Sequence, residues 1–201
     1  MKKYILFQSL IIFLLQCDSN PDLIISENQC IDLNCQENIN NFLIKITARM
    51  QPYDNQNFEE ISDTENYLGV HFNATNEYDS EYDILESPNG PGNWVSLYFP
   101  HDDWGHPLGD KFTKDVKSNV FLDMNNKVAE WTFIVESNIY GTVDLSFQTI
   151  DEYCYDCIKS IQLFSEDGDY FTADMNMDNI SISRFLQQNQ LLSFNLIIEF
   201  N

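Results

Sequence analysis

The sequence predicts an all-β fold, an antiparallel β-sandwich of immunoglobulin-like or jelly-roll-like type that follows an N-terminal signal helix. The chain has 201 residues with 43% hydrophobic content, enough for one domain with a packed core. Apolar and polar residues alternate with a period of two along many short segments, as expected for half-buried strands. Turn-rich segments join these strands, and no convincing helix separates them, which favours antiparallel pairing.

The alternation begins at Phe42, where Phe42, Ile44, Ile46, Ala48 and Met50 share one face of a predicted strand. Residues 183–190 contain helix-forming residues, but the segment is short and fits a loop equally well. Hairpin turns are predicted at residues 138–141 and 166–169, the second with Asp-Gly at its centre. Further strands are predicted over residues 67–72, 94–99, 131–135, 142–147, 160–163, 171–178 and 192–200.

The first residues indicate export. Lys2 and Lys3 form a short positive region, and an apolar stretch too short to span a bilayer follows them, as in a secretory signal. We therefore expect a signal peptide over residues 1–16, a polar tether over 17–41 and a single β-sandwich domain over 42–201. The predicted location is the cell envelope, facing the periplasm or the exterior.

The end of this leader, Leu14-Leu15-Gln16-Cys17, resembles a bacterial lipoprotein signal. The resemblance implies that Cys17 is acylated, becomes the mature N-terminus and anchors the chain to a membrane without a transmembrane helix. Gln16 departs from the small residue that this family prefers at that position. The alternative is an ordinary cleaved signal peptide, an unmodified Cys17 and a secreted protein.

The charge of the chain excludes one class of partner. A formal net charge of −22 repels phosphate backbones, so we expect no nucleic-acid binding. The same charge repels anionic lipid surfaces. It suits a soluble domain with a cationic ligand, or with a neutral or cationic partner.

The body of the chain resembles an uncharacterised β-sandwich module of secreted bacterial proteins, many of which end in a type IX sorting domain. The resemblance covers most of residues 42–201, implies a β-sandwich fold and carries no activity. The free-standing, lipid-anchored layout departs from the multidomain arrangement of those proteins. The matching segments are residues 68–70, 74–75, 78–79, 82–83, 86, 88, 95–101, 104–105, 131–135 and 141–147.

Four cysteines remain besides Cys17. Cys30 and Cys35 are separated by four residues, and Cys154 and Cys157 by two. Export permits disulfides, which are our prediction for these residues, either within each pair or between the tether and the domain. A zinc site is the alternative, but the first pair is loosely spaced for one.

An acidic loop between two predicted strands is a candidate calcium site, because oxygen ligands on one flexible loop can converge on a hard cation. A solvated acidic loop is the competing interpretation. His101, Asp102, Asp103 and His106 offer a second metal set, although Trp104 between them is typical of a tight aromatic turn. The acidic-loop residues are Glu77, Asp79, Glu81, Asp83 and Glu86.

A glycan-binding surface is predicted from the strand at residues 94–99. If Val95, Leu97 and Phe99 face the core, then Trp94 and Tyr98, with Trp104 nearby, face outward and could stack on sugar rings. The alternative is that the second face of this strand is covered by the other sheet or by the long loop.

The sequence contains no nucleophile elbow, no zinc-protease motif and no glycine-rich phosphate loop, so we expect no catalytic activity. The predicted function is a non-catalytic structural or interaction module of the cell envelope with a protein or glycan partner. The alternative is a carbohydrate-binding or calcium-dependent adhesive module. An enzyme with a carboxylate pair is the third hypothesis.

Overall fold

The computed structural model describes residues 41–53, 59–119, 127–150, 158–166, 170–173 and 180–200. The predicted signal peptide, Cys17 and the tether up to residue 40 lie outside these residues. The disulfide candidates lie outside them as well, so their pairing stays a prediction; they are Cys30, Cys35, Cys154 and Cys157.

The described residues form strands and one short 3-10 helix, η1 (Asp102–Trp104), which confirms the all-β prediction. The first strand begins one residue before the predicted start of the domain. The strands are β1 (Asn41–Pro52), β2 (Ile61–His71), β3 (Ile84–Leu85), β4 (Val95–Pro100), β5 (Lys111–Ser118), β6 (Val128–Ser137), β7 (Gly141–Thr149), β8 (Ile158–Ser165), β9 (Tyr170–Ala173), β10 (Ser181–Leu186) and β11 (Leu191–Phe200).

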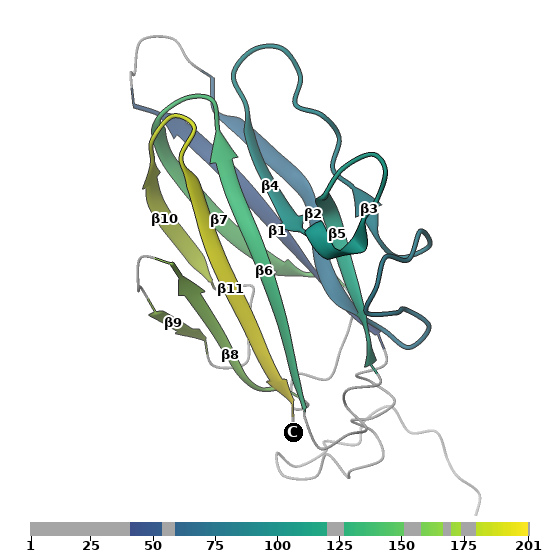
Figure 1. The fold of residues 1–201 in the computed structure, drawn as a ribbon. Helices are drawn as coiled ribbons and strands as arrows, with labels where there is room; N and C mark the ends of the chain where they lie inside the picture. The colour runs from purple at the N-terminus through teal and green to yellow at the C-terminus, as the bar shows by residue number, and fades with distance from the viewer. Residues whose placement is uncertain are drawn as a thin grey trace, which may run out of the picture.

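The strands belong to one continuous sheet in the order β10-β7-β1-β2-β5-β4-β6-β11-β8-β9, with β3 added beside β5. The sheet curls strongly, so that β6, β11 and β8 lie in front of β1 and β7 (Figure 1). The structure therefore shows one curled sheet in place of the two separate sheets predicted for a sandwich. The prediction of purely antiparallel pairing is also wrong, because β2 and β5 are parallel.

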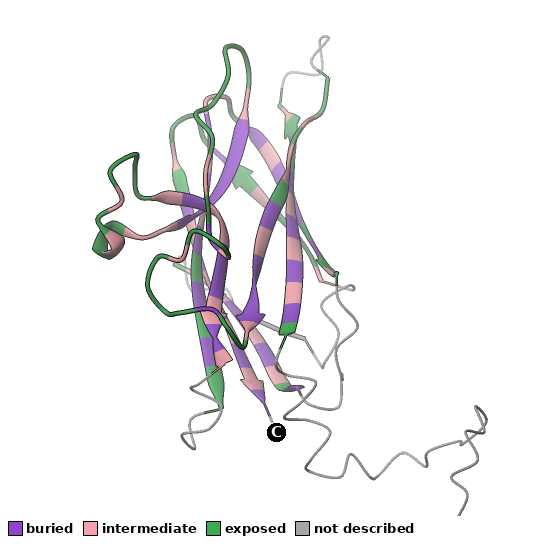
Figure 2. Cartoon of the chain, turned by 90° about the vertical axis from the view of Figure 1, so that its right-hand side faces the viewer, coloured by how far each residue is buried: buried purple, intermediate pink, exposed green. Residues whose placement is uncertain are grey.

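The concave side of the curled sheet holds the hydrophobic core. Every second residue of β1 from Phe42 to Met50 is buried there, as the alternation predicts. Side chains from the two halves of the sheet meet across the core, with the Phe42 and Trp131 rings 6.0 Å apart and the Phe133 and Phe147 rings 6.4 Å apart. The strands alternate between buried and more exposed residues along their length (Figure 2).

Strand β4 forms the corner where the two halves join. Its first four residues pair with β6, whereas only Phe99 and Pro100 pair with β5. The Leu97 N–H therefore lacks a strand partner on the β2 side, and the Asp63 carboxylate of β2 accepts it at 2.7 Å. Burial raises the pKa of Asp63, although this hydrogen bond partly offsets the effect.

This bond gives a test of the corner. We expect Asp63→Ala to lower the free energy of unfolding by about 1–3 kcal/mol, because a buried backbone N–H loses its acceptor. Asp63→Asn keeps an oxygen acceptor and removes a half-buried charge, so its loss should be clearly smaller. Urea denaturation of the three proteins measures both differences, and an Asp63→Ala variant as stable as the wild type would contradict the assignment.

Candidate functional site

The residues predicted to bind metal or glycan gather around β3, β4, β5 and η1, on the right-hand side of Figure 1. Three loops reach this region: residues 72–83 before β3, residues 86–94 before β4, and residues 101–110, which contain η1. We call these three loops and the strands beneath them the loop region. The parallel pairing of β2 with β5 places the β2–β3 loop directly beside β5.

Asp83 fastens the acidic loop to the sheet. Its side chain is 3% exposed, and its two oxygens accept the backbone N–H groups of Val116, at 3.0 Å, and Asp79, at 2.8 Å. Burial raises the pKa of Asp83 to about 6, and the charges of Asp115 and Asp79 add to the shift. The Asp79 carboxylate in turn accepts the Glu81 N–H at 3.0 Å. Two of the five calcium candidates thus hold the loop's own backbone.

The other three calcium candidates do not join Asp83 in one group. Glu77 and Glu81 are exposed, and Glu86 lies beyond β3 in a separate depression. In the part of the chain that the structure describes, no group of three or more His, Cys, Asp or Glu side chains is placed to hold a metal ion. Calcium binding by this loop stays a prediction without a preformed ligand set.

All three histidines of the chain pack against aromatic rings in the loop region. His101 Nε2 lies 3.0 Å from the buried Asp115 carboxylate, and its ring stacks on Trp104 with centroids 3.5 Å apart. His106 contacts the Tyr78 ring at 4.7 Å. His101 and His106 are therefore packed separately into an aromatic turn, which agrees with the aromatic-turn interpretation of this segment.

In the predicted glycan-binding row of Trp94, Tyr98 and Trp104, the structure buries Tyr98 and leaves the two tryptophans partly exposed. Tyr98 is 4% exposed, because both faces of β4 are covered and the Lys111 ammonium lies over its ring at 4.1 Å. Trp104 is partly buried against His101. Trp94 is partly exposed. The alternative of a covered second face is what the structure shows for Tyr98.

A pocket of about 250 Å³ opens between the β3–β4 loop and the start of β5. Burial raises the pKa of Glu86, which lines it, to about 7, and the charge of Asp63 adds to the shift; Ser96, Thr113 and Lys111 offset it in part. The Ser96 hydroxyl donates to Glu86 at 3.4 Å. The lining residues are Leu85, Glu86, Ser87, Pro88, Asn89, Ser96, Leu108, Gly109, Asp110 and Lys111.

Lys111, on the rim of this pocket, is already paired. Its Nζ lies 2.6 Å from the Glu136 carboxylate of β6, so it links the two strands on either side of β4. The hydrogen bond to Glu136 and the neighbouring Tyr98 raise the pKa of Lys111 against the opposing effect of burial. Lys111 therefore links β5 to β6 and also lines the pocket.

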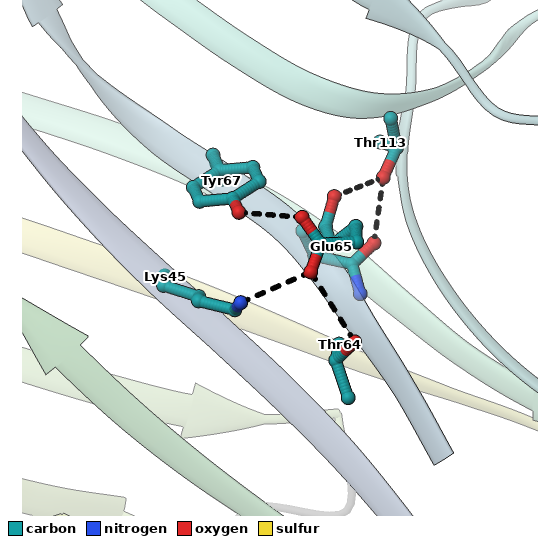
Figure 3. A network of polar contacts seen from close by, with 6 residues as sticks. Lys45, Thr64, Glu65, Tyr67 and Thr113 are labelled. Carbon is teal, nitrogen blue, oxygen red and sulfur yellow. Dashed lines mark hydrogen bonds and ion pairs between the residues drawn. The ribbon is translucent and has the colours of Figure 1, made fainter. Parts of the chain in front are cut away.

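A polar network on the outer face of β1, β2 and β5 centres on Glu65 (Figure 3). The Glu65 carboxylate accepts from the Tyr67 hydroxyl at 2.7 Å, the Lys45 ammonium at 3.1 Å and the Thr64 hydroxyl at 3.4 Å. The Thr113 hydroxyl donates to the Glu65 backbone carbonyl at 2.6 Å. The hydrogen bonds from Tyr67 and Lys45 lower the pKa of Glu65. The network ties three strands together on an exposed surface.

Sequence reasoning missed Asp63, Glu65 and Asp115. Asp63 and Glu65 lie in the polar run Ser62 to Asn66, where the alternation of β2 is interrupted by a register shift against β1. Such a break in period is the signal that could have marked them. Asp115 carries no comparable signal, since an isolated acid in a strand usually faces solvent.

No family model, curated protein or solved structure matches this chain. Within the ranges that the structure describes, no helix is long and apolar enough to cross a membrane.

Glu86 gives a pH-dependent test. Its pKa is raised from 4.5 to about 7, so the folded state binds its proton more tightly than the unfolded state does. The wild type should therefore lose stability relative to Glu86→Gln as the pH rises from about 5 to 8. We expect a relative change of about 1–2 kcal/mol after allowance for solvent screening.

Urea denaturation at pH 5, 6.5 and 8 measures this change. The exposed Glu77→Gln on the acidic loop is the matched control, and its difference from the wild type should stay constant over the same range. Parallel pH profiles for the wild type and Glu86→Gln would show that folding does not raise the pKa of Glu86.

Proposed function

We propose that the chain is an exported, lipid-anchored and non-catalytic interaction module of the cell envelope. The observation that carries the non-catalytic part is the use of ionisable side chains in the loop region as structural ties. Asp83 binds two backbone amides, His101 pairs with the buried Asp115, and Lys111 pairs with Glu136. An acid or base in catalysis must present its lone pair or proton to a substrate. These groups instead bind other groups of the protein.

The carboxyl that comes nearest to an enzymatic arrangement is Glu86, in its pocket. A glycosidase-type mechanism needs a second carboxyl facing the same substrate. The nearby Asp63 has one oxygen bound to the Leu97 amide, which favours a structural role for it. Glu86 and Asp63 therefore support a glycosidase less well than they support a non-catalytic binding module.

Export and anchoring are supported by the sequence of the leader. The positive Lys2 and Lys3, the short apolar stretch and Cys17 together fit acylation at Cys17, with residues 17–41 as the tether. The anchored domain would project from the membrane. Its high negative charge keeps it soluble there and repels anionic headgroups.

The two sequence-based alternatives differ in support. A calcium-dependent adhesive module would need its acidic loop to rearrange, because Asp83 and Asp79 already bind backbone amides. A carbohydrate-binding module would need exposed aromatic rings other than Tyr98. The finer fold prediction, a two-sheet sandwich of immunoglobulin or jelly-roll type, stays a proposal, since the described strands form one curled sheet.

The anchor is tested by expressing the full chain in a bacterial host fed an alkyne-bearing palmitate analogue. We expect the wild type to incorporate the label and to partition into the detergent phase of Triton X-114. Cys17→Ser should lose the label and move to the aqueous phase, whereas Cys30→Ser should behave like the wild type. An unlabelled wild type, or a labelled Cys17→Ser, would refute acylation at this residue.

A further inference from the structure

Three exposed aromatic side chains meet on the outer face of the sheet, away from the loop region. Tyr53 follows β1, Tyr140 precedes β7 and Phe185 belongs to β10; they are 69%, 43% and 51% exposed. The Tyr53 ring centroid lies 5.8 Å from that of Tyr140 and 6.1 Å from that of Phe185. We call these residues the aromatic patch. It lies where β1 and β10 end and β7 begins, at the upper left of Figure 1.

The backbone fixes the patch in place. The Tyr53 N–H donates to the Tyr140 carbonyl at 3.3 Å, immediately beyond the ladder pair of Pro52 and Gly141. A Cβ on Gly141 would lie 2.2 Å from the Gln51 carbonyl oxygen, so only glycine allows β1 and β7 to approach so closely here. Phe185 is on the next strand, and its perpendicular ring, at 89° to Tyr53, packs edge to face.

Hydrogen-bonding side chains continue from the patch along the same outer face. Gln51 and Phe185 both pair with Thr142 in the ladder, and Arg49 and Ser183 both pair with Asp144 one row further on. The Ser183 hydroxyl donates to the Asp144 carboxylate. The strand pattern places the members of this strip outward, since the intervening residues are buried; the strip comprises Arg49, Gln51, Thr142, Asp144 and Ser183.

We infer that this face is a binding site for a neutral polysaccharide, with the aromatic patch stacking on the apolar faces of pyranose rings. Exposed aromatic faces attract the weakly positive C–H groups of a sugar, and amide, guanidinium and carboxylate groups bind its hydroxyls. The face belongs to the outside of a sheet and not to a pocket, which suits a polymer lying along it. The net charge of −22 disfavours an anionic polymer.

A protein partner fits this face less well. Stable protein interfaces bury about 800 Å² on each partner around an apolar core that is poor in charge. Here the aromatic patch has three side chains, and the adjoining strip includes Arg49 and Asp144. Alternating polar groups beside a small cluster of exposed aromatic rings match the surface of a sugar chain better than the core of a protein interface.

The inference relies on the proposed function only for its setting outside the cell, where polysaccharide is present. The test uses the full chain purified in a mild detergent and incubated with suspended microcrystalline cellulose or chitin, and with soluble glucomannan or xylan in native gels. We expect retention on at least one of these neutral polymers and none on alginate. Tyr53→Ala and Phe185→Ala should each weaken retention about tenfold or more.

Two matched variants separate stacking from general effects. Tyr53→Phe keeps the ring and should keep most of the binding, and Leu108→Ala removes an apolar side chain that is 78% exposed elsewhere and should bind like the wild type. Thermal unfolding of each variant checks that the fold is kept. The inference is overturned if no neutral polymer retains the wild type, if alginate retains it equally well, or if folded Tyr53→Ala and Phe185→Ala bind normally. Failure of anchoring in the palmitate experiment leaves this result unaffected.

Discussion

The fold depends on the corner at β4, where one strand must satisfy two neighbours that diverge. Along its first four residues β4 pairs with β6, and at its end it pairs with β5. A diverging neighbour leaves a backbone N–H unpaired in the interior, and such a group is costly unless an acceptor replaces the missing strand. The Asp63 carboxylate supplies that acceptor for Leu97 at 2.7 Å. The curl of the sheet around its core thus relies on a side-chain oxygen acceptor at a partly buried position.

The same solution recurs in the loop region. The Asp83 carboxylate accepts the backbone N–H groups of Val116 and Asp79. The Asp115 carboxylate lies 3.0 Å from His101 Nε2. Asp63 and Asp83 accept backbone N–H groups, whereas Asp115 contacts a side chain. Burial raises the pKa of Asp63, Asp83 and Glu86. In a chain of net charge −22, burial and neighbouring carboxylates both disfavour the ionised form of these acids. Asp83 holds the acidic loop on β5, and Asp63 holds β4. These contacts favour a structural role for the acidic residues in this part of the chain.

The outer face of β1, β7 and β10 differs from the loop region in its constraints. No loop among the described residues is required to hold these strands together, because their ladders are long and regular. Side chains on this face can therefore vary at a small cost to the fold, about 0.2–1 kcal/mol for each cross-strand pair. Here the structure exposes Tyr53, Tyr140 and Phe185. Exposed aromatic rings at a position that stability does not demand are the feature that favours binding.

The sequence by itself determined the all-β class and most of the strands. The alternation from Phe42 to Met50 appears in the structure as predicted, because the period of a strand is a local property. The hairpin predicted at residues 138–141 is wrong: the turn there joins β6 to β7, but β6 pairs with β4 and β11, and β7 pairs with β1 and β10. The sequence pattern did not predict β5, because the buried Asp115 interrupts its apolar alternation. It also did not predict β10, because that segment contains helix-forming residues. Only the tertiary structure decided the single curled sheet, the parallel pairing of β2 with β5 and the burial of Tyr98. Alternation separates the two faces of a strand, but the segments that cover each face come from distant parts of the chain.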